Sequence, residues 1–449
     1  MKKYKLLPLI FMAMSFTIMS QSFETDRLPI GDSDRKYDFC AVKLDKQFDT
    51  DLDKETSFKE MIEALRQKRI VLIGETHTNQ LHHDVQYEII KGLVESAKPV
   101  VLALEMFNPN QNEQLAAWSS GETDPNTFLE QTDFLTTWSH NYRYYEAIFD
   151  YVREKHIPIY GANVERKYAS KIGRGGLSSL TEEERSTIPD IDTSTVEHKY
   201  FFKVAMEGMD AIMPKIFNNM YQAQSLWDAA MGEGAITAAN KHPDATVVVL
   251  AGSGHVVYNL GIGRIIKDRS DLSFVSVVVV DVPDEVEDSG MMKIKKDTKK
   301  NMPKEMSQMK SNETPKEDSL KNVTPKNAHM MGMTEMDNTP NRIVARSLAD
   351  YLLGKKETKR DKYPSFGFSV KDKEDQGYPI KRVLPETIAA ENGLMTGDII
   401  ITIDEKEFKS LFDLKKHLQY KNWNEEISFQ IRRGDEVKII SFTIEPVEE

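Results

Sequence analysis

Acidic and imidazole side chains stand directly after several apolar runs of this sequence. The run 71–74 is followed by Glu75 and His77, and the run 247–254 is followed by His255. Carboxylates and imidazoles serve proteins as general acids and bases and as ligands of metal ions. These positions are therefore the first candidates for a functional site.

Two further runs end in a similar way. The run 100–104 is followed by Glu105, and the run 157–161 is followed by Asn163. Strands of a buried parallel sheet are near-continuous apolar runs, and ligands of open α/β sheets bind beyond the carboxyl ends of such strands. A single glutamate at a strand end is as often a solvated rim charge, so the prediction depends on several ends meeting. If the four runs lie side by side, one rim gathers five side chains: Glu75, His77, Glu105, Asn163 and His255.

Three other segments leave two interpretations open. His82 and His83 are adjacent at the start of a predicted helix, so at most one of them faces the rim. The aromatic segment 138–149 is either a helix packed on the sheet or one wall of an apolar pocket. The same choice, core or ligand-facing lid, applies to an apolar stripe at helical spacing. Its members are Met206, Met209, Met213, Phe217 and Met220.

Helical and strand-like patterns alternate after the first apolar run, which predicts a fold of the α/β class. We expect a mainly parallel sheet with crossover helices, a helical insertion over 181–241 and a last strand over 272–280. The chain has 449 residues, of which 40% are hydrophobic, so two domains with connecting segments are expected. The net charge of −12 argues against a nucleic-acid-binding protein, and the single cysteine, Cys40, excludes an internal disulfide.

The first 22 residues have the pattern of a signal peptide. Basic residues at 2–5 precede an apolar stretch over 6–19, and small residues follow at 20–22. The stretch is short for a membrane anchor, which is the alternative interpretation. Cys40 lacks the small preceding residue of a lipoprotein processing site. We therefore predict an exported protein, periplasmic or associated with the cell surface.

Composition divides the rest of the chain. Residues 40–283 are predicted to form the α/β domain. The segment 284–340 is charged and almost free of aromatic residues, which predicts a disordered linker. Residues 341–356 show apolar side chains at helical spacing, which predicts a helix, and residues 363–447 form the second domain.

Five blocks of the first domain resemble the ChaN family of bacterial haem-binding uptake proteins. They are Gly74-Glu75-Thr76-His77 with His82-His83, Leu104-Glu105-Met106-Phe107, Gln224-Ser225-Leu226-Trp227-Asp228-Ala229-Ala230-Met231, Leu250-Ala251-Gly252-Ser253-Gly254-His255 and Gly261-Ile262-Gly263-Arg264. The resemblance spans about residues 57–281 and implies an exported haem-binding protein linked to iron uptake. Haem requires an axial histidine or tyrosine, an apolar slot and cations for its propionates. The resemblance leaves several candidates for these roles: His77, His255, Tyr145, Tyr168, Tyr221 and Tyr258 for the iron, and Arg166 and Arg264 for the propionates.

The same blocks look more distantly like the Tiki and TraB group, to which metal-dependent hydrolysis is attributed. By that resemblance His77, Glu105 and His255 would hold zinc or manganese, and Glu75 would act as the general base. The four residues would then be catalytic. Haem binding is the leading hypothesis, and a metal-dependent hydrolase is its alternative.

The C-terminal part closely resembles a bacterial PDZ domain, a small α+β fold. In that fold the backbone around Phe366, Gly367 and Phe368 would hold the carboxylate of a partner's C-terminal peptide. A predicted helix over 411–420 would close the groove. The alternative is a PDZ domain that only packs on its neighbour. The partner's identity and the oligomeric state, for which a homodimer is one candidate, remain open.

Overall fold

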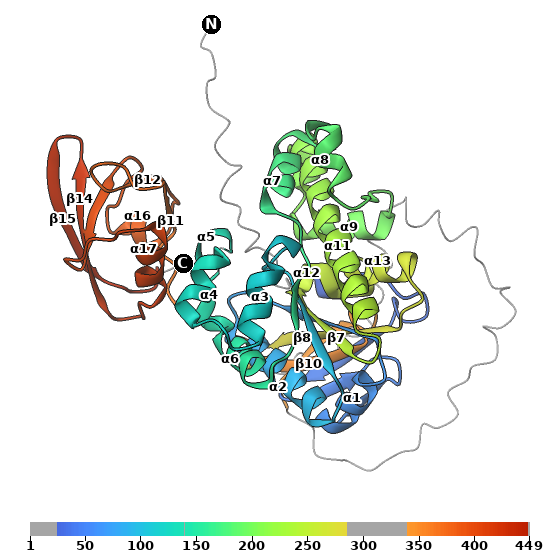
Figure 1. Cartoon of the computed structure of the whole chain (residues 1–449). Helices are drawn as coiled ribbons and strands as arrows, with labels where there is room; N and C mark the ends of the chain where they lie inside the picture. Colours follow the sequence, from blue (N-terminus) through green and yellow to red (C-terminus); the bar gives the residue numbers. More distant parts are fainter. Residues whose placement is uncertain (1–24, 139, 285–338, 448–449) are drawn as a thin grey trace, which may run out of the picture.

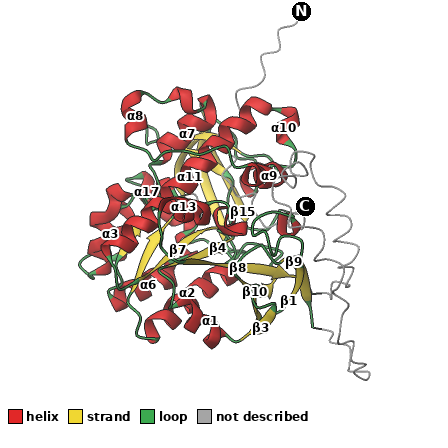
Figure 2. Cartoon of the chain, turned by 90° about the vertical axis from the view of Figure 1, so that its right-hand side faces the viewer, coloured by secondary structure: helices red, strands yellow, loops and turns green. Residues whose placement is uncertain are grey.

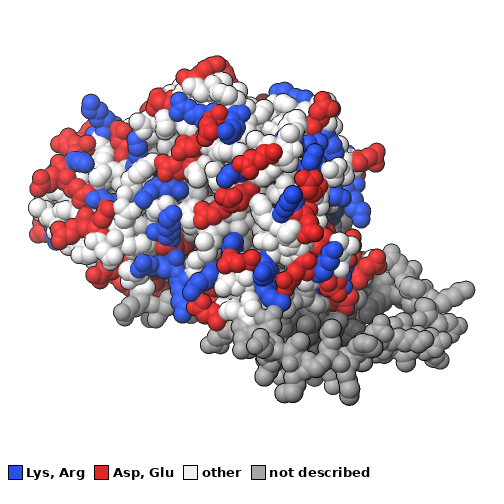
Figure 3. Space-filling view, turned by 90° about the horizontal axis from the view of Figure 1, so that it is seen from below, with Lys and Arg blue, Asp and Glu red and all other residues white. Residues whose placement is uncertain are grey.

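The computed structural model describes residues 25–138, 140–284 and 339–447. The predicted signal peptide lies outside these residues, as does nearly all of the predicted linker. Within the described ranges no helix has the length and apolar character needed to cross a membrane. On the face shown in Figure 3, basic and acidic side chains are interspersed.

A mostly parallel sheet of eight strands forms the centre of the first domain. Its parallel strands β4, β7 and β5 lie side by side, with β8 beyond β4 and β6 beyond β5. The bounds are β4 (Ile70–Glu75), β5 (Val100–Leu104), β6 (Ile159–Gly161), β7 (Thr246–Gly252) and β8 (Phe274–Val282). Every residue of β4, β5 and β7 is buried, as expected for valine- and leucine-rich strands covered on both faces. The predicted α/β class is confirmed.

Helices cover both faces of this sheet (Figures 1 and 2). One face packs on the helices α1 (Phe58–Leu65), α2 (Gln80–Glu95), α3 (Asn112–Ser119), α4 (Pro125–Gln131), α5 (Phe134–Thr137) and α6 (Glu146–Lys155). The other face packs on α11 (Pro214–Lys241), α12 (Ser253–Val256) and α13 (Ile262–Arg269). Successive side chains of a strand point to opposite faces of the sheet, so the apolar residues of each strand are divided between two hydrophobic cores, one on each face.

The segment 341–356, predicted as a helix, forms two strands. Strand β9 (Asn341–Ala345) pairs antiparallel with β1 (Phe39–Lys43), and β10 (Tyr351–Lys356) lies parallel to β8. The helix prediction is wrong because short apolar runs fit either period, and the β-branched pair Ile343 and Val344 favours a strand.

The first domain therefore continues beyond the predicted linker. Strand β10 also pairs antiparallel with β2 (Gln47–Asp49), which in turn pairs with β3 (Lys54–Thr56). The sheet order is β3-β2-β10-β8-β4-β7-β5-β6. Residues on both sides of the segment 285–338 thus belong to one sheet.

A helical arm stands over the carboxyl ends of the strands (Figure 1). It consists of α7 (Arg166–Gly175), α8 (Glu182–Ser186), α9 (Val196–Ala205), α10 (Met209–Ile212) and the first turns of α11. Helix α7 packs along α11 through a small apolar cluster that includes Ile172 and Leu226. The arm overlaps the helical insertion predicted over 181–241 but begins earlier, at α7, and it provides a roof over the strand ends.

The second domain has a five-stranded antiparallel sheet and two helices. The strand order is β11 (Phe368–Val370), β12 (Tyr378–Val383), β13 (Ile399–Ile403), β14 (Glu426–Arg433) and β15 (Glu436–Thr443). The helices are α16 (Ile388–Glu391) and α17 (Leu411–Gln419), and the core contains Phe429 and Leu414. Strand β11 lies at the edge of this sheet, the position at which a peptide can be added as a further strand.

Candidate functional site

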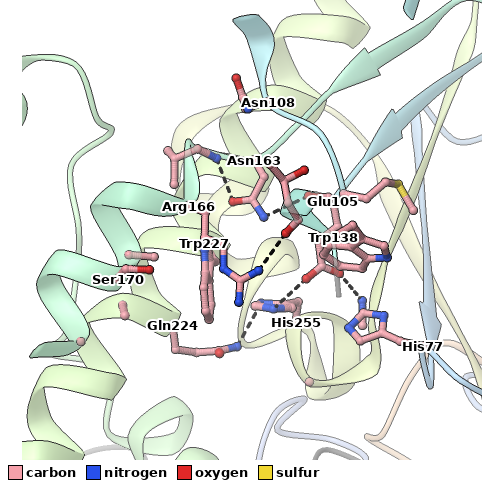
Figure 4. A pocket seen from close by; sticks show the side chains of 18 of the residues that line it. His77, Glu105, Asn108, Trp138, Asn163, Arg166, Ser170, Gln224, Trp227 and His255 are labelled. Carbon is pink, nitrogen blue, oxygen red and sulfur yellow. Dashed lines mark hydrogen bonds and ion pairs between the residues drawn. The ribbon is translucent and has the colours of Figure 1, made fainter. Parts of the chain in front are cut away.

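A cavity of about 630 Å³ lies between the strand ends and the helical arm. All five side chains that the sequence placed on one rim line it: Glu75, His77, Glu105, Asn163 and His255. Figure 4 shows four of them converging from the ends of different strands. The expected meeting of several strand ends at one concave opening is therefore found.

The arm supplies two chemically different walls to this cavity. Helix α7 contributes the basic side chains Arg166, Lys167 and Arg174. The wall contributed by α10, α11 and the residue between them is largely apolar. Its members are Met209, Met213, Ile216, Met220, Ala223 and Trp227. An apolar slot with cations along one side suits a flat, apolar ligand that carries carboxylates.

Glu75 ends strand β4 and is fully engaged by its neighbours. One carboxylate oxygen lies 2.7 Å from His77 Nδ1 and accepts a 2.7 Å hydrogen bond from the Tyr145 hydroxyl. His83 Nδ1 lies 3.0 Å from the other oxygen. Burial opposes ionisation, but the charge of His83 and these hydrogen bonds hold the pKa of Glu75 well below its usual value. Glu75 therefore acts as a fixed negative charge that orients His77.

His77 faces the cavity from the loop after β4. Burial would lower its pKa, but the hydrogen bond with Glu75 and the charge of Glu105 raise it above the usual value. A Cβ atom added to Gly252 would lie 3.0 Å from His77 Nε2, so only glycine allows this close approach without displacement. This explains physically why β7 ends in glycine.

Glu105 follows strand β5 and lies between the two imidazoles. Its Oε2 atom accepts a 2.6 Å hydrogen bond from the Gly252 backbone N–H, and its Oε1 atom lies 3.5 Å from His255 Nε2. Asn163 is held near it, because its side-chain amide donates to the Glu105 carbonyl at 3.1 Å. Glu105 thus brings a carboxylate to the floor of the cavity.

His255 is oriented from behind by a buried carboxylate of the block 224–231, which carries the family resemblance but for which no site role was predicted. Asp228 Oδ1 lies 2.6 Å from His255 Nδ1, and the Gln224 amide lies 3.0 Å from the same nitrogen. Asp228 also lies 3.2 Å from His198 Nε2. The charge of Asp228 raises the pKa of His255 against the opposing effect of burial. The spacing of Gln224 and Asp228, four residues apart on one helix, was the available signal.

A third imidazole, also missed, flanks His77. The His140 ring centroid lies 4.5 Å and the Trp138 centroid 5.0 Å from that of His77. Burial and the positive charge of His77 lower the pKa of His140 to about 3. His140 is therefore a neutral imidazole at physiological pH, the form that binds metals.

Several predicted site residues do not line the cavity. The Tyr145 hydroxyl donates to Glu75, and Tyr258 donates to the Thr25 carbonyl at 2.6 Å. Arg264 pairs with Asp192 at 2.9 Å. The remaining tyrosine candidates, Tyr168 and Tyr221, are likewise absent from the lining. The structure therefore does not place Tyr145, Tyr258 or Arg264 where a ligand of this cavity would contact them.

Arg166, by contrast, lines the cavity. Its Nη1 atom donates to the Thr137 carbonyl at 2.8 Å, and Figure 4 shows its side chain extending among the labelled residues. Neither His82 nor His83 lines the cavity. His82 lies 3.1 Å from Asp281, and His83 supports Glu75 from behind.

The described residues contain no group of three or more histidine, cysteine or acidic side chains arranged to hold a metal ion. The metal set of His77, Glu105 and His255 therefore stays a prediction. Glu75 is poorly placed as a general base, because its carboxylate is already bonded to three neighbours. The two imidazoles and the apolar wall instead fit a porphyrin, whose iron takes histidine, methionine, cysteine or tyrosine as axial ligands.

The first domain matches a family model described as haem-binding uptake, Tiki superfamily, ChaN, over residues 61–266. This domain belongs to the ChaN family. The second domain matches the PDZ family model over residues 364–444. The ChaN-type domain of this chain is larger than the matched range, because β10 adds to its sheet from residues 351–356.

Three solved structures are similar to parts of the chain. A Campylobacter jejuni structure, titled as cofacial haem binding to ChaN, has 22% identity and a TM-score of 0.44, covering 54% of this chain and 92% of its own. The HtrA-type protease AlgW with a decapeptide has 21% identity and a TM-score of 0.18, covering 19% and 29%. The HtrA3 PDZ domain with a phage-derived ligand has 16% identity and a TM-score of 0.17, covering 18% and 83%. No curated protein matches the chain. The assignment therefore depends on the two family models.

Proposed function

We propose that this protein binds haem in the cavity above the strand ends, in the service of iron uptake outside the cytoplasm, and that its PDZ domain recruits the C-terminus of a partner protein. The observation that carries the proposal is the composition of one cavity. Imidazoles line its floor, methionines and Trp227 line it from α10 and α11, and three cations line it from α7. Export rests on the signal-peptide pattern of residues 1–22.

The cavity offers several groups that can ligate haem iron. His77 and His255 each engage Nδ1 with a buried carboxylate, which leaves Nε2 as the nitrogen for a ligand. His140 supplies a neutral imidazole beside His77. Methionine sulfur is available from the α10–α11 wall, and methionine with histidine is a known axial pair for haem. Haem, when bound, would bring its iron; the chain holds the ring, orients the imidazoles and neutralises the propionates.

An absorption titration with hemin tests the proposal. The purified protein should give a Soret band that differs from that of free hemin and saturates at a fixed stoichiometry. Replacing His77, His140 and His255 together with alanine should shift the Soret maximum or abolish the band. Absorbance that rises without saturation, or a spectrum indifferent to these substitutions, would contradict haem binding at this site.

The carboxylate-binding loop of the PDZ domain makes a separate prediction. Gly367 has a φ of +76°, and a Cβ atom added there would lie 2.3 Å from the Thr387 side chain. Gly367→Val should therefore distort the loop and weaken capture of C-terminal peptides at least about tenfold, with hemin binding unchanged. Phe366 is unsuitable for this test because its side chain is buried in the PDZ core.

A matched glycine provides the control. Gly434 also has a positive φ, +61°, but an added Cβ would meet no atom within 4 Å. Gly434→Val carries a similar backbone cost without the collision, so it should retain peptide capture. Pull-down with a library of immobilised apolar C-terminal peptides measures both variants. Equal capture by the two would indicate that the loop does not bind the carboxylate and that the PDZ domain packs only on its neighbour.

A further inference from the structure

Each of the two strand-end histidines of the cavity donates from Nδ1 to a buried carboxylate. His77 Nδ1 lies 2.7 Å from Glu75 Oε1. His255 Nδ1 lies 2.6 Å from Asp228 Oδ1. Glu75 is 2% exposed and Asp228 is 0% exposed. The carboxylates come from separate elements, the end of strand β4 and the middle of helix α11, so the same arrangement is built twice at one cavity.

A second buried imidazole holds the other oxygen of each carboxylate. His83 Nδ1 lies 3.0 Å from Glu75 Oε2. His198 Nε2 lies 3.2 Å from Asp228 Oδ2. Both of these imidazoles are 1% exposed. Each carboxylate is thus fixed between two rings, which keeps its first oxygen directed at the histidine of the cavity.

A hydrogen bond to a carboxylate changes what an imidazole offers to a metal ion. The carboxylate draws the Nδ1 proton toward itself, and this makes Nε2 a more basic ligand. A more basic ligand stabilises the higher oxidation state of haem iron, and such hydrogen bonds are one of the means by which proteins set haem potentials. The effect is strong for buried partners, because a low dielectric weakens electrostatic interactions less than water does.

The charges of the cavity floor act in the same direction. Glu105 adds a third carboxylate, and its Oε1 atom lies 3.5 Å from His255 Nε2. Ferric haem carries one more positive charge at the iron than ferrous haem, so nearby carboxylates favour the ferric form. The basic residues Arg166, Lys167 and Arg174 line the cavity from α7 rather than from the strand ends. Negative charge is therefore concentrated at the imidazole end of the cavity.

We propose that these carboxylate–imidazole pairs make the cavity selective for ferric over ferrous haem, with Glu75 and Asp228 as the positioning residues that set the preference. The inference rests on the proposed haem function and adds to it the oxidation state of the ligand. It holds whichever of His77 and His255 ligates the iron, because both imidazoles have the same support. Ligation by methionine sulfur predicts the opposite, since a methionine ligand raises the potential of haem iron.

The affinities of the full-length wild-type protein for the two forms of haem test the preference directly. Hemin should bind at least about tenfold more tightly than dithionite-reduced haem, with both affinities measured by absorption titration under argon. Equal affinities, or tighter binding of the reduced form, would overturn the proposal while leaving haem binding intact. A wild-type protein that bound neither form would contradict the haem function itself, and the inference with it.

Substitution of the carboxylates assigns the preference to them. Glu75→Gln or Asp228→Asn, whichever removes the support of the ligating imidazole, should reduce the ratio of ferric to ferrous affinity about tenfold, a rise of about 59 mV in the midpoint potential. A merely structural role would weaken the binding of both forms equally and leave the potential unchanged. If both variants bind hemin at the wild-type potential, the assignment to these carboxylates is wrong.

A conservative variant predicts a shift of the opposite sign. The Tyr145 hydroxyl donates to Glu75 Oε1, the same oxygen that accepts from His77. Tyr145→Phe leaves this oxygen to His77 alone, so a fall in the midpoint potential would support the proposal and identify His77 as the ligand. A rise would contradict it. Tyr258→Phe is the matched control, because its hydroxyl donates to the Thr25 carbonyl, and it should leave the potential unchanged.

Discussion

Asp228→Asn is expected to lower the free energy of unfolding of the ChaN-type domain by about 3–5 kcal/mol, the usual cost of removing one partner of a buried ion pair. Asp228 has no exposed surface and lies between two imidazoles, 2.6 Å from His255 and 3.2 Å from His198. Loss of its charge removes the carboxylate beside His198 and leaves His255 only the more distant Glu105, 3.5 Å from its Nε2 atom. The substitution should also release the ring of His255, because asparagine holds it only by a neutral hydrogen bond.

Chemical denaturation measures this effect. The control is Asp244→Asn, a change at an exposed aspartate on the loop after α11.

The pH dependence of the free energy of unfolding gives a second check. The two imidazoles hold the pKa of Asp228 below its ordinary value of 3.8 against the opposing effect of burial. A carboxyl with a depressed pKa stabilises the fold above its unfolded pKa, and that contribution is lost as pH falls through the folded value. The raised pKa of His255 adds a contribution that is fully present below its unfolded value of 6.5 and is lost at higher pH. The difference between wild type and Asp228→Asn should therefore be largest at about pH 5–6 and shrink below about pH 4. If Asp228→Asn left the free energy of unfolding unchanged, the ion pair between Asp228 and the two imidazoles would not organise the site.

The second large effect concerns the space inside the cavity. Ser170→Trp should reduce hemin affinity by at least about 100-fold, because an indole at this position would occupy the slot that the porphyrin needs. Ser170 lies on α7 and lines the cavity (Figure 4). The fold should be retained, since the added ring has the cavity to enter.

Ser178→Trp is the matched control. Ser178 is an exposed residue just after α7 that does not line the cavity. Its hemin titration should match that of wild type, and circular dichroism should show both variants folded. If Ser170→Trp bound hemin as tightly as Ser178→Trp did, the porphyrin would have to bind elsewhere on the molecule.

Sequence reasoning found the cavity floor because the signal was local. Glu75, Glu105 and His255 each follow a buried apolar strand within a few residues, and parallel strands carry their carboxyl ends to one edge. The sequence alone did not indicate which aromatic residues reach that edge of the sheet. Tyr145 and Tyr258 point into the protein, since each hydroxyl finds a buried acceptor there.

Longer-range features were beyond a single sequence. The return of β10 to the first sheet depends on pairing across the segment 285–338, for which spacing gives no signal. The methionine stripe was treated as one unit, but Met213 leaves the helical region and separates α10 from α11. Met209, Met213 and Met220 line the cavity, whereas Phe217 does not and lies in an apolar cluster to which Met209 and Met220 also contribute.

A crystal structure of the full-length protein with hemin tests the central claim most directly. We expect electron density for the porphyrin between the methionine wall of α11 and the basic side of α7, with the iron on the side of His77, His140 and His255. The propionates should lie toward Arg166. A porphyrin bound outside this cavity, or a cavity that stays empty in crystals whose protein has bound hemin, would contradict the account.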